Sequence, residues 1–154
     1  MKRRRKLKQR DLLTKHEIKK IIDVAKNIRD KALISILIES GARIVEFLTL
    51  KVKDVKFGNH KAILTIRNMS SNSIREVQLK KSVPYIKKWI KSHPLNNDPN
   101  APLWVTKDCK PLNSPIVRKV LRSFAKKART KKKVVPHNFR YMRALYLLKK
   151  KNVG

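Results

Sequence analysis

Hydrophobic positions recur with a helical period over the first part of this chain. Thr14 and Glu17 form a capping-box pattern, in which the threonine hydroxyl and the glutamate carboxylate accept hydrogen bonds from free amides of a first helical turn. A second helix is expected over residues 30–40, and its apolar residues lie nearly all round it, which is typical of a buried central helix. Gly41 is expected to end it, before a short helix at 44–48. The inner face of the first helix is formed by Ile18, Ile21, Ile22 and Ala25.

The pattern changes to alternation in the middle of the chain. Residues 62–66 and 74–79 predict two strands, and the second alternates apolar and polar positions. The intervening segment 68–73 is polar and turn-like, so the two strands are expected to form a hairpin. Ser82 and Pro84 then predict the start of another helix. Its inner face is formed by Ile86, Trp89 and Ile90.

Two further helices are predicted in the last third. After a loop and a short extended piece at 103–105, Ser114 and Pro115 repeat the cap-plus-proline signal. Pro136 is expected to open the last helix, after a basic loop. The whole pattern predicts an α+β fold that is mainly helical and carries a small antiparallel hairpin or sheet.

Charge adds a functional constraint. The chain has 154 residues, with 41 Lys and Arg against 10 Asp and Glu, and its net charge is +31. No acidic residue follows Asp108, and residues 1–10 contain seven cations. A lysine-rich solvated surface would normally be balanced by glutamate, which is missing here. Such a charge favours a polyanionic partner, because a basic face gains affinity for nucleic acid by releasing counterions.

Several protein classes are excluded by composition. No apolar run is long enough to cross a bilayer, and the basic start lacks the apolar stretch of a signal peptide. The single cysteine, Cys109, cannot form an internal disulfide, and no Cys/His cluster has zinc-ligand spacing. We therefore expect a cytoplasmic protein without a membrane partner, a metal or another cofactor.

Two local patterns carry candidate chemistry. Arg43 lies among apolar residues at the end of the buried helix, where it is expected either to pair with Glu46 or Glu39 or to grip an oxyanion with its planar fork. His137 and Arg140 are three positions apart and share one helical face. That pair fits a phosphate-binding arginine beside a proton-transferring histidine, or simply a helix-terminal histidine with an exposed arginine.

The motifs in order resemble those of a known family. G-A-R-I-V-E, a β-hairpin, S-V-P-Y-I-K-K-W-I and P-H-N-F-R together are similar to the catalytic domain of tyrosine recombinases, especially archaeal and phage-type integrases of the Xer-like group. The resemblance covers about residues 11–150. It implies that Arg43 and Arg140 clamp the scissile phosphate, that Glu46 supports Arg43, and that His137 assists proton transfer. In this family a tyrosine then attacks the phosphate to form a 3′-phosphotyrosyl link.

The chain also departs from the family pattern. The hairpin turn carries no lysine, since the matching position is Ser71 or Met69 depending on the register. The family's nucleophile lies a few dozen residues beyond the second arginine, whereas Tyr146 follows it by only a few positions. We therefore expect residues 11–154 to be a recombinase catalytic domain truncated at its C-terminus before the nucleophile segment, preceded by a basic arm or linker at 1–10.

These observations predict a fragment of a site-specific tyrosine recombinase or integrase that binds double-stranded DNA, possesses no nucleophile of its own and is inactive as an isolated chain. Other recombinase protomers are expected partners on the DNA. The alternatives are a catalytically inactive DNA-binding regulator derived from an integrase and, on charge alone, a basic RNA-binding protein. The cations expected to contact DNA are Arg3, Arg4, Arg5, Arg67, Arg75, Lys131, Lys132 and Lys133.

Overall fold

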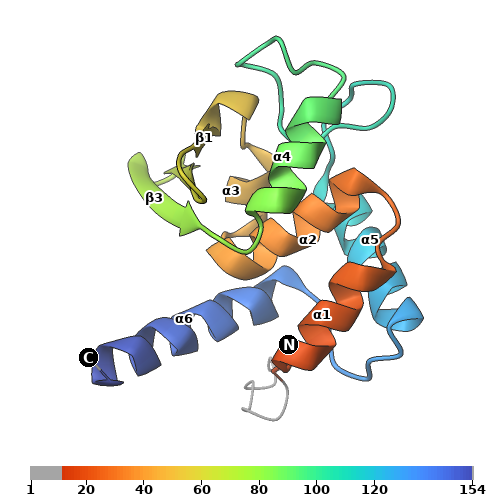
Figure 1. The fold of residues 1–154 in the computed structure, drawn as a ribbon, viewed down its shortest axis with the longest axis vertical. Coiled ribbons are helices and arrows are strands. Elements are labelled where there is room, and N and C mark those ends of the chain that lie inside the picture. The colour runs from red at the N-terminus through yellow and green to blue at the C-terminus, as the bar shows by residue number, and fades with distance from the viewer. Residues whose placement is uncertain (1–11, 154) are drawn as a thin grey trace.

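The computed structural model describes the backbone of residues 12–153 and the side chains of residues 12–145. The predicted α+β class is confirmed: the fold is mainly helical, with one small antiparallel sheet at one side of the helices (Figure 1). The elements in chain order are α1 (Lys15–Val24), α2 (Ile28–Ser40), α3 (Ile44–Leu48), the 3-10 helix η2 (Val52–Asp54), β1 (Val55–Phe57), β2 (Ala62–Asn68), β3 (Ser73–Leu79), α4 (Val83–Ser92), α5 (Ser114–Lys127) and α6 (Pro136–Val153).

Helix α2 forms the centre of the fold, as its apolar surface predicts. It contacts α1, α4, α6 and β3, and Figure 1 shows the sheet on one side of it and α1 and α5 on the other. Because other elements pack on several sides of α2, its C-terminal end gives the following residues a defined position. Among the described residues, no helix is both long and apolar enough to cross a membrane. The α2 residues without solvent exposure are Ala32, Leu33, Ile34, Ile36 and Leu37.

The sheet is a meander in the order β1-β2-β3. The two longer strands pair from Ala62 opposite Leu79 to Asn68 opposite Ser73, so the hairpin turn comprises residues 69–72. Alternate residues of β2 are buried and the rest are partly exposed, as a sheet with one face on the core requires. The short strand β1 and helix η2 were not predicted, because three residues are too few to show a period.

The start of α1 is the capping box that the sequence predicts. Thr14 Oγ1 accepts from the amide of Glu17 at 3.1 Å, and Glu17 Oε1 accepts from the amide of Thr14 at 2.9 Å. Helix α2 begins two residues earlier than predicted, because Asn27 Oδ1 accepts from the amide of Asp30 at 2.7 Å. An asparagine cap satisfies a free amide of the first turn and so sets the start of the helix.

The two cap-plus-proline signals mark helices, but the capping groups differ from those predicted. Ser82 makes no side-chain cap to α4; its hydroxyl donates to Glu39 Oε1 at 2.7 Å. The Glu39 carboxylate also accepts from the amides of residues 80–82, so a side chain from α2 satisfies the amides leading into α4. At α5 the cap is Asn113 rather than Ser114, since Asn113 Oδ1 accepts from the amide of the third helical residue at 3.0 Å.

Candidate functional site

The end of α2 allows a very close approach of α6. Gly41 has a φ of +60°, in the left-handed region, and its amide donates to the Leu37 carbonyl at 3.1 Å to end the helix. A Cβ at this glycine would lie 2.8 Å from Arg143 Cβ and 3.6 Å from Arg140 Cα. The absence of a side chain at Gly41 therefore lets α6 rest directly on the end of α2, which brings Arg140 to the junction between α2 and α3.

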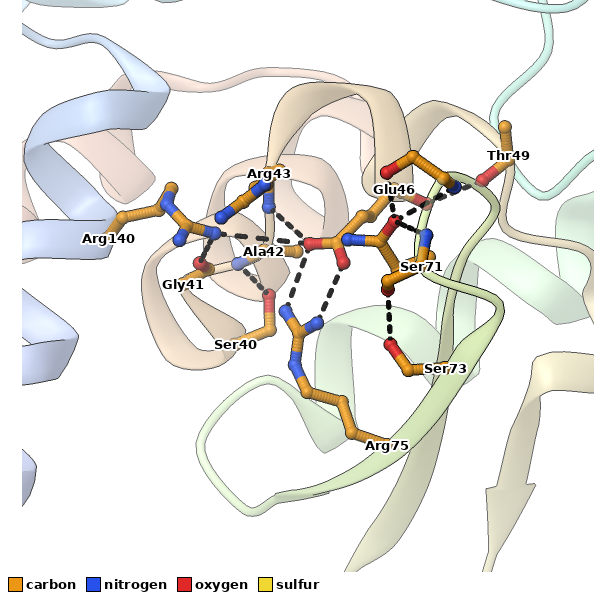
Figure 2. Close-up of polar contacts among 12 residues, drawn as sticks. Ser40, Gly41, Ala42, Arg43, Glu46, Thr49, Ser71, Ser73, Arg75 and Arg140 are labelled. Atoms are coloured by element: carbon orange, nitrogen blue, oxygen red, sulfur yellow. Dashed lines mark hydrogen bonds and ion pairs between the residues drawn. The ribbon is translucent and has the colours of Figure 1, made fainter.

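A buried carboxylate lies at the centre of this junction. Glu46 is 4% exposed, and its Oε1 accepts from the backbone amide of Arg43 at 3.0 Å. Arg75 of β3 donates to both carboxylate oxygens, at 2.7 Å to Oε2 and 3.0 Å to Oε1. Arg140 Nη1 lies 3.9 Å from Oε1. Figure 2 shows the guanidinium groups of Arg75 and Arg140 approaching Glu46 from different sides.

Arg140 lies where other positive charges act on it. Its side chain is 35% exposed, and Nη1 donates to the Gly41 carbonyl at 3.4 Å, from 99 positions away in the chain. Partial burial lowers the pKa of Arg140, and the nearby charge of Arg43 lowers it further, while Glu46 opposes both effects. The charge of Arg43 thus acts on Arg140 although the two residues are far apart in sequence. The guanidinium still stays protonated at neutral pH.

Arg43 differs from its expected environment. The residue is exposed and stands in extended conformation just before α3, rather than inserting among apolar side chains. The Glu46 carboxylate accepts from the backbone amide of Arg43, but its bidentate ion pair is with the guanidinium of Arg75 and not with that of Arg43. Glu39, the other predicted partner, binds amides near the start of α4. The left-handed turn at Gly41 redirects the chain, so the arginine that follows it points away from the core.

His137 is the second residue of α6 and is exposed. It precedes Arg140 by three positions on the same helix, as the H-x-x-R spacing predicts. The residues between them anchor the helix: Asn138 Nδ2 donates to the Lys133 carbonyl at 2.7 Å, and Phe139 is 1% exposed. An exposed histidine and a half-buried arginine are therefore carried on a helix start that is fixed by buried neighbours.

Three of the cations predicted to contact DNA are paired with carboxylates. Arg67 pairs with the buried carboxylate of Asp54, and Arg75 pairs with Glu46. Lys132 Nζ donates to the Leu12 carbonyl at 2.7 Å. It also pairs with the carboxylate of Glu17 on α1. Sequence reasoning missed these pairings, because the partners lie far apart in the chain and no local spacing relates them. Lys131 and Lys133 are exposed, and the predicted contacts Arg3, Arg4 and Arg5 lie outside the described residues.

The loop before α6 is tied to the start of α1 by Glu17. Lys132 Nζ donates to Glu17 Oε1 at 2.6 Å, and the Thr130 hydroxyl donates to Oε2 at 3.2 Å. Partial burial acts to raise the pKa of Glu17, but hydrogen bonds from Lys132 and Thr14 outweigh it and lower the pKa from 4.5 to about 2. The carboxylate that caps α1 therefore also fixes the segment leading into α6.

The arrangement around Glu46 is suited to binding an anion. Three guanidinium groups act at this junction, and one carboxylate compensates them only in part. Arg75 takes both oxygens of that carboxylate, which leaves Arg43 exposed and Arg140 at ion-pair distance but beyond hydrogen-bond distance. Arginine binds phosphate and carboxylate oxygens with two parallel N–H donors.

The chain is similar in sequence to curated tyrosine recombinases. It is 30% identical over 140 residues to tyrosine recombinase XerA of Pyrococcus horikoshii, covering 90% of this chain and 47% of that protein. It is also 30% identical over 149 residues to tyrosine recombinase XerH of Campylobacter jejuni, covering 91% of this chain and 41% of that protein. The chain thus spans less than half the length of these curated relatives.

Solved structures show the same fold. A crystal structure of XerA recombinase superimposes with a TM-score of 0.77 and 26% identity, over 90% of this chain and 51% of that one. XerH bound to its difH substrate has a TM-score of 0.77 at 24% identity, over 92% of this chain and 44% of that one. The family model described as the phage integrase family matches residues 11–152. The resemblance predicted from the motifs is confirmed, and the chain belongs to the phage integrase family.

Proposed function

We propose that this chain is the phosphate-gripping part of a tyrosine recombinase catalytic domain, which binds duplex DNA and holds the scissile phosphate between Arg43 and Arg140. The observation that carries this proposal is the convergence of the two arginine motifs at Glu46. Arg140 of α6 lies 3.9 Å from the buried Glu46 carboxylate, and the same carboxylate accepts from the backbone amide of Arg43 just before α3. The charge of Arg43 also acts on Arg140, so the two motifs meet at one junction. A pair of fixed cations can stabilise the charge that develops on a phosphate during strand exchange.

The relatives support DNA as the substrate class. The XerH structure is a pre-cleavage complex with its difH substrate, and a lambda integrase dimer with the same fold is bound to a core site. The net charge of +31 favours the same partner, since phosphate contacts dominate the affinity of proteins for DNA. Of the cations predicted to contact DNA, Lys131 and Lys133 are exposed just before α6, where they can contact the phosphates that flank the site.

His137 is assigned to proton transfer at the gripped phosphate. It is exposed on the first turn of α6, one turn before Arg140, so it faces solvent where DNA would arrive. An imidazole can accept and return a proton near neutral pH. The hairpin turn supplies no lysine for the leaving oxygen, and Arg67 at its base is engaged by Asp54. We infer that His137 serves proton transfer at this site without help from a lysine of the turn.

The test is the salt dependence of binding to a short labelled DNA duplex, measured by fluorescence anisotropy. The wild-type affinity is expected to fall steeply with salt, with a log–log slope of roughly −0.9 for each phosphate contacted. Arg140→Met should weaken binding and reduce that slope by about one phosphate. Arg29→Met is the matched control, because it removes an arginine whose partner is Asp30 at the opposite end of α2.

Two results would contradict the proposal. A wild-type affinity that does not change with salt would remove the phosphate grip, and equal effects of Arg140→Met and Arg29→Met would remove the role of the junction. A duplex RNA competitor addresses the other nucleic acid that the charge permits. DNA is expected to be preferred, and a clear preference for RNA would replace the recombinase assignment by RNA binding.

A further inference from the structure

Arg75 stands in a position that neither the arginine motif nor the H-x-x-R motif explains. It lies on β3, paired opposite Ile66 of β2, and its guanidinium reaches across to α3. There it donates one hydrogen bond to each oxygen of Glu46, at 2.7 and 3.0 Å. This bidentate geometry is the strongest arginine–carboxylate arrangement, and it is the shortest ion-pair contact that Glu46 makes.

Two arginine side chains, Arg75 and Arg140, lie within ion-pair distance of the Glu46 carboxylate. Hydrogen bonding to Arg75 is the largest of the effects on the pKa of Glu46, and it lowers that pKa. Arg140 Nη1 lies only 3.9 Å from the oxygen that Arg75 and the Arg43 amide already share. The carboxylate is 4% exposed and cannot turn to bulk water if a partner is lost. Burial makes an unpaired carboxylate expensive, so it would move to the next available cation.

We propose that Arg75 is a positioning residue of the phosphate site: by occupying both oxygens of Glu46 it keeps Arg140 free to bind phosphate. The inference rests on the proposed function and adds a specific role to a residue that charge alone would assign to DNA contact. Without Arg75, Glu46 closes the short gap to Arg140 and holds its guanidinium. The Arg140 guanidinium, which would otherwise bind phosphate, is then paired with Glu46.

The role of Arg75 is separable from direct contact with DNA by removing Glu46's charge as well. In Arg75→Met, affinity for the labelled duplex should fall roughly 10- to 100-fold, the loss expected for one charged hydrogen-bonded contact. In the double variant Arg75→Met with Glu46→Gln, the neutral amide no longer captures Arg140. Its Oε1 can still accept from the Arg43 amide, so the local backbone stays supported. Affinity and salt slope should return close to those of Glu46→Gln alone.

Arg75→Lys gives a second, charge-conserving measurement if Arg75→Met proves poorly folded. Lysine keeps the positive charge but offers a point charge rather than a planar fork, so it cannot hold both oxygens of Glu46. The proposal expects Arg75→Lys to lose affinity, with recovery on adding Glu46→Gln. A direct phosphate contact by Arg75 would instead survive in Arg75→Lys, with an unchanged salt slope. Thermal melts of each variant establish that the compared chains are folded.

The outcomes distinguish this inference from the proposed function. Wild-type binding together with an unrescued loss in the double variant would overturn the role of Arg75 and leave the phosphate grip intact. Wild-type affinity in Arg75→Met would also overturn the inference. Absence of salt-dependent DNA binding by the wild-type chain would remove the proposed function, and the inference would fall with it. Recovery in the double variant, against a wild-type protein that binds DNA, is the result that supports it.

Discussion

Substitution of Gly41 by alanine should both destabilise the fold and weaken the phosphate site. The left-handed φ of +60° costs a residue with a side chain roughly 1–2 kcal/mol. The new methyl group would lie 2.8 Å from Arg143 Cβ, well inside the about 3.5–4.0 Å at which carbon atoms pack, so α6 must move. Such overpacking costs roughly a further 1–3 kcal/mol. For a chain of this length the melting temperature should fall by roughly 5–15 °C.

Gly58→Ala is the matched control for this prediction. A Cβ at Gly58 would meet its nearest neighbour, the Lys61 carbonyl oxygen, at 3.8 Å, which is ordinary contact, and the substitution should change stability by less than about 0.5 kcal/mol. Gly41→Asn separates the two causes, because asparagine tolerates the left-handed region but still carries the Cβ. Thermal melts and duplex affinity are measured for all three variants. If Gly41→Ala melts like Gly58→Ala, the glycine does not set the approach of α6, and the derivation of Arg140's position from it is wrong.

Three further outcomes are expected. Lys132→Met should lower the free energy of unfolding by about 1 kcal/mol at neutral pH. Because the Glu17 pKa is lowered from 4.5 to about 2, that difference should shrink as the pH falls from 4.5 toward 2; a pH-independent difference in denaturant midpoints would contradict it. Asn113→Ala should cost about 1 kcal/mol while Ser114→Ala changes little, and the reverse order in thermal melts would return the α5 cap to the serine. The isolated chain should form no covalent adduct with a nicked suicide duplex on a denaturing gel. The reason is that residue 141 projects about 100° away from Arg140 on α6, and Tyr85 lies on α4. A shifted band that Tyr141→Phe abolishes would identify a relocated nucleophile.

Local signals in the sequence predicted most of the helices. The apolar period of α2, the capping box at Thr14 and the glycine after Ser40 each act within a few residues, so their outcome does not depend on the rest of the chain. The hairpin was predicted for the same reason, with strands one or two residues longer than expected. Strand β1 has only three residues and exists through its pairing with β2, in which Val55 stands opposite Leu64. No local pattern could show it.

The meeting of the candidate site residues was predictable in part. The motifs identified Arg43, Glu46 and Arg140, and the structure brings them to one junction. The environment of Arg43 was not foreseen, because the left-handed turn at Gly41 changes the direction of the chain after a buried helix. Arg75 was expected to contact DNA on the strength of its charge alone. Its pairing with a carboxylate 29 positions away depends on how the hairpin packs against α3, which is a tertiary property.

The charges at the junction support the proposal that it binds an anion. A protein with a net charge of +31 gains nothing in stability from placing three arginines together, and burial and Arg43 already lower the pKa of Arg140. The buried Glu46 carboxylate offsets part of the repulsion among the three arginines, but Arg75 occupies both of its oxygens. Positive charge that is compensated in this incomplete way raises the energy of the free protein. In the proposed function, an incoming phosphate would lower that energy directly. Among the described residues no ion pair of Arg43 would have to break, and Arg140 would not have to leave a hydrogen-bonded carboxylate. Such preorganised cations are what stabilisation of a transition-state charge requires.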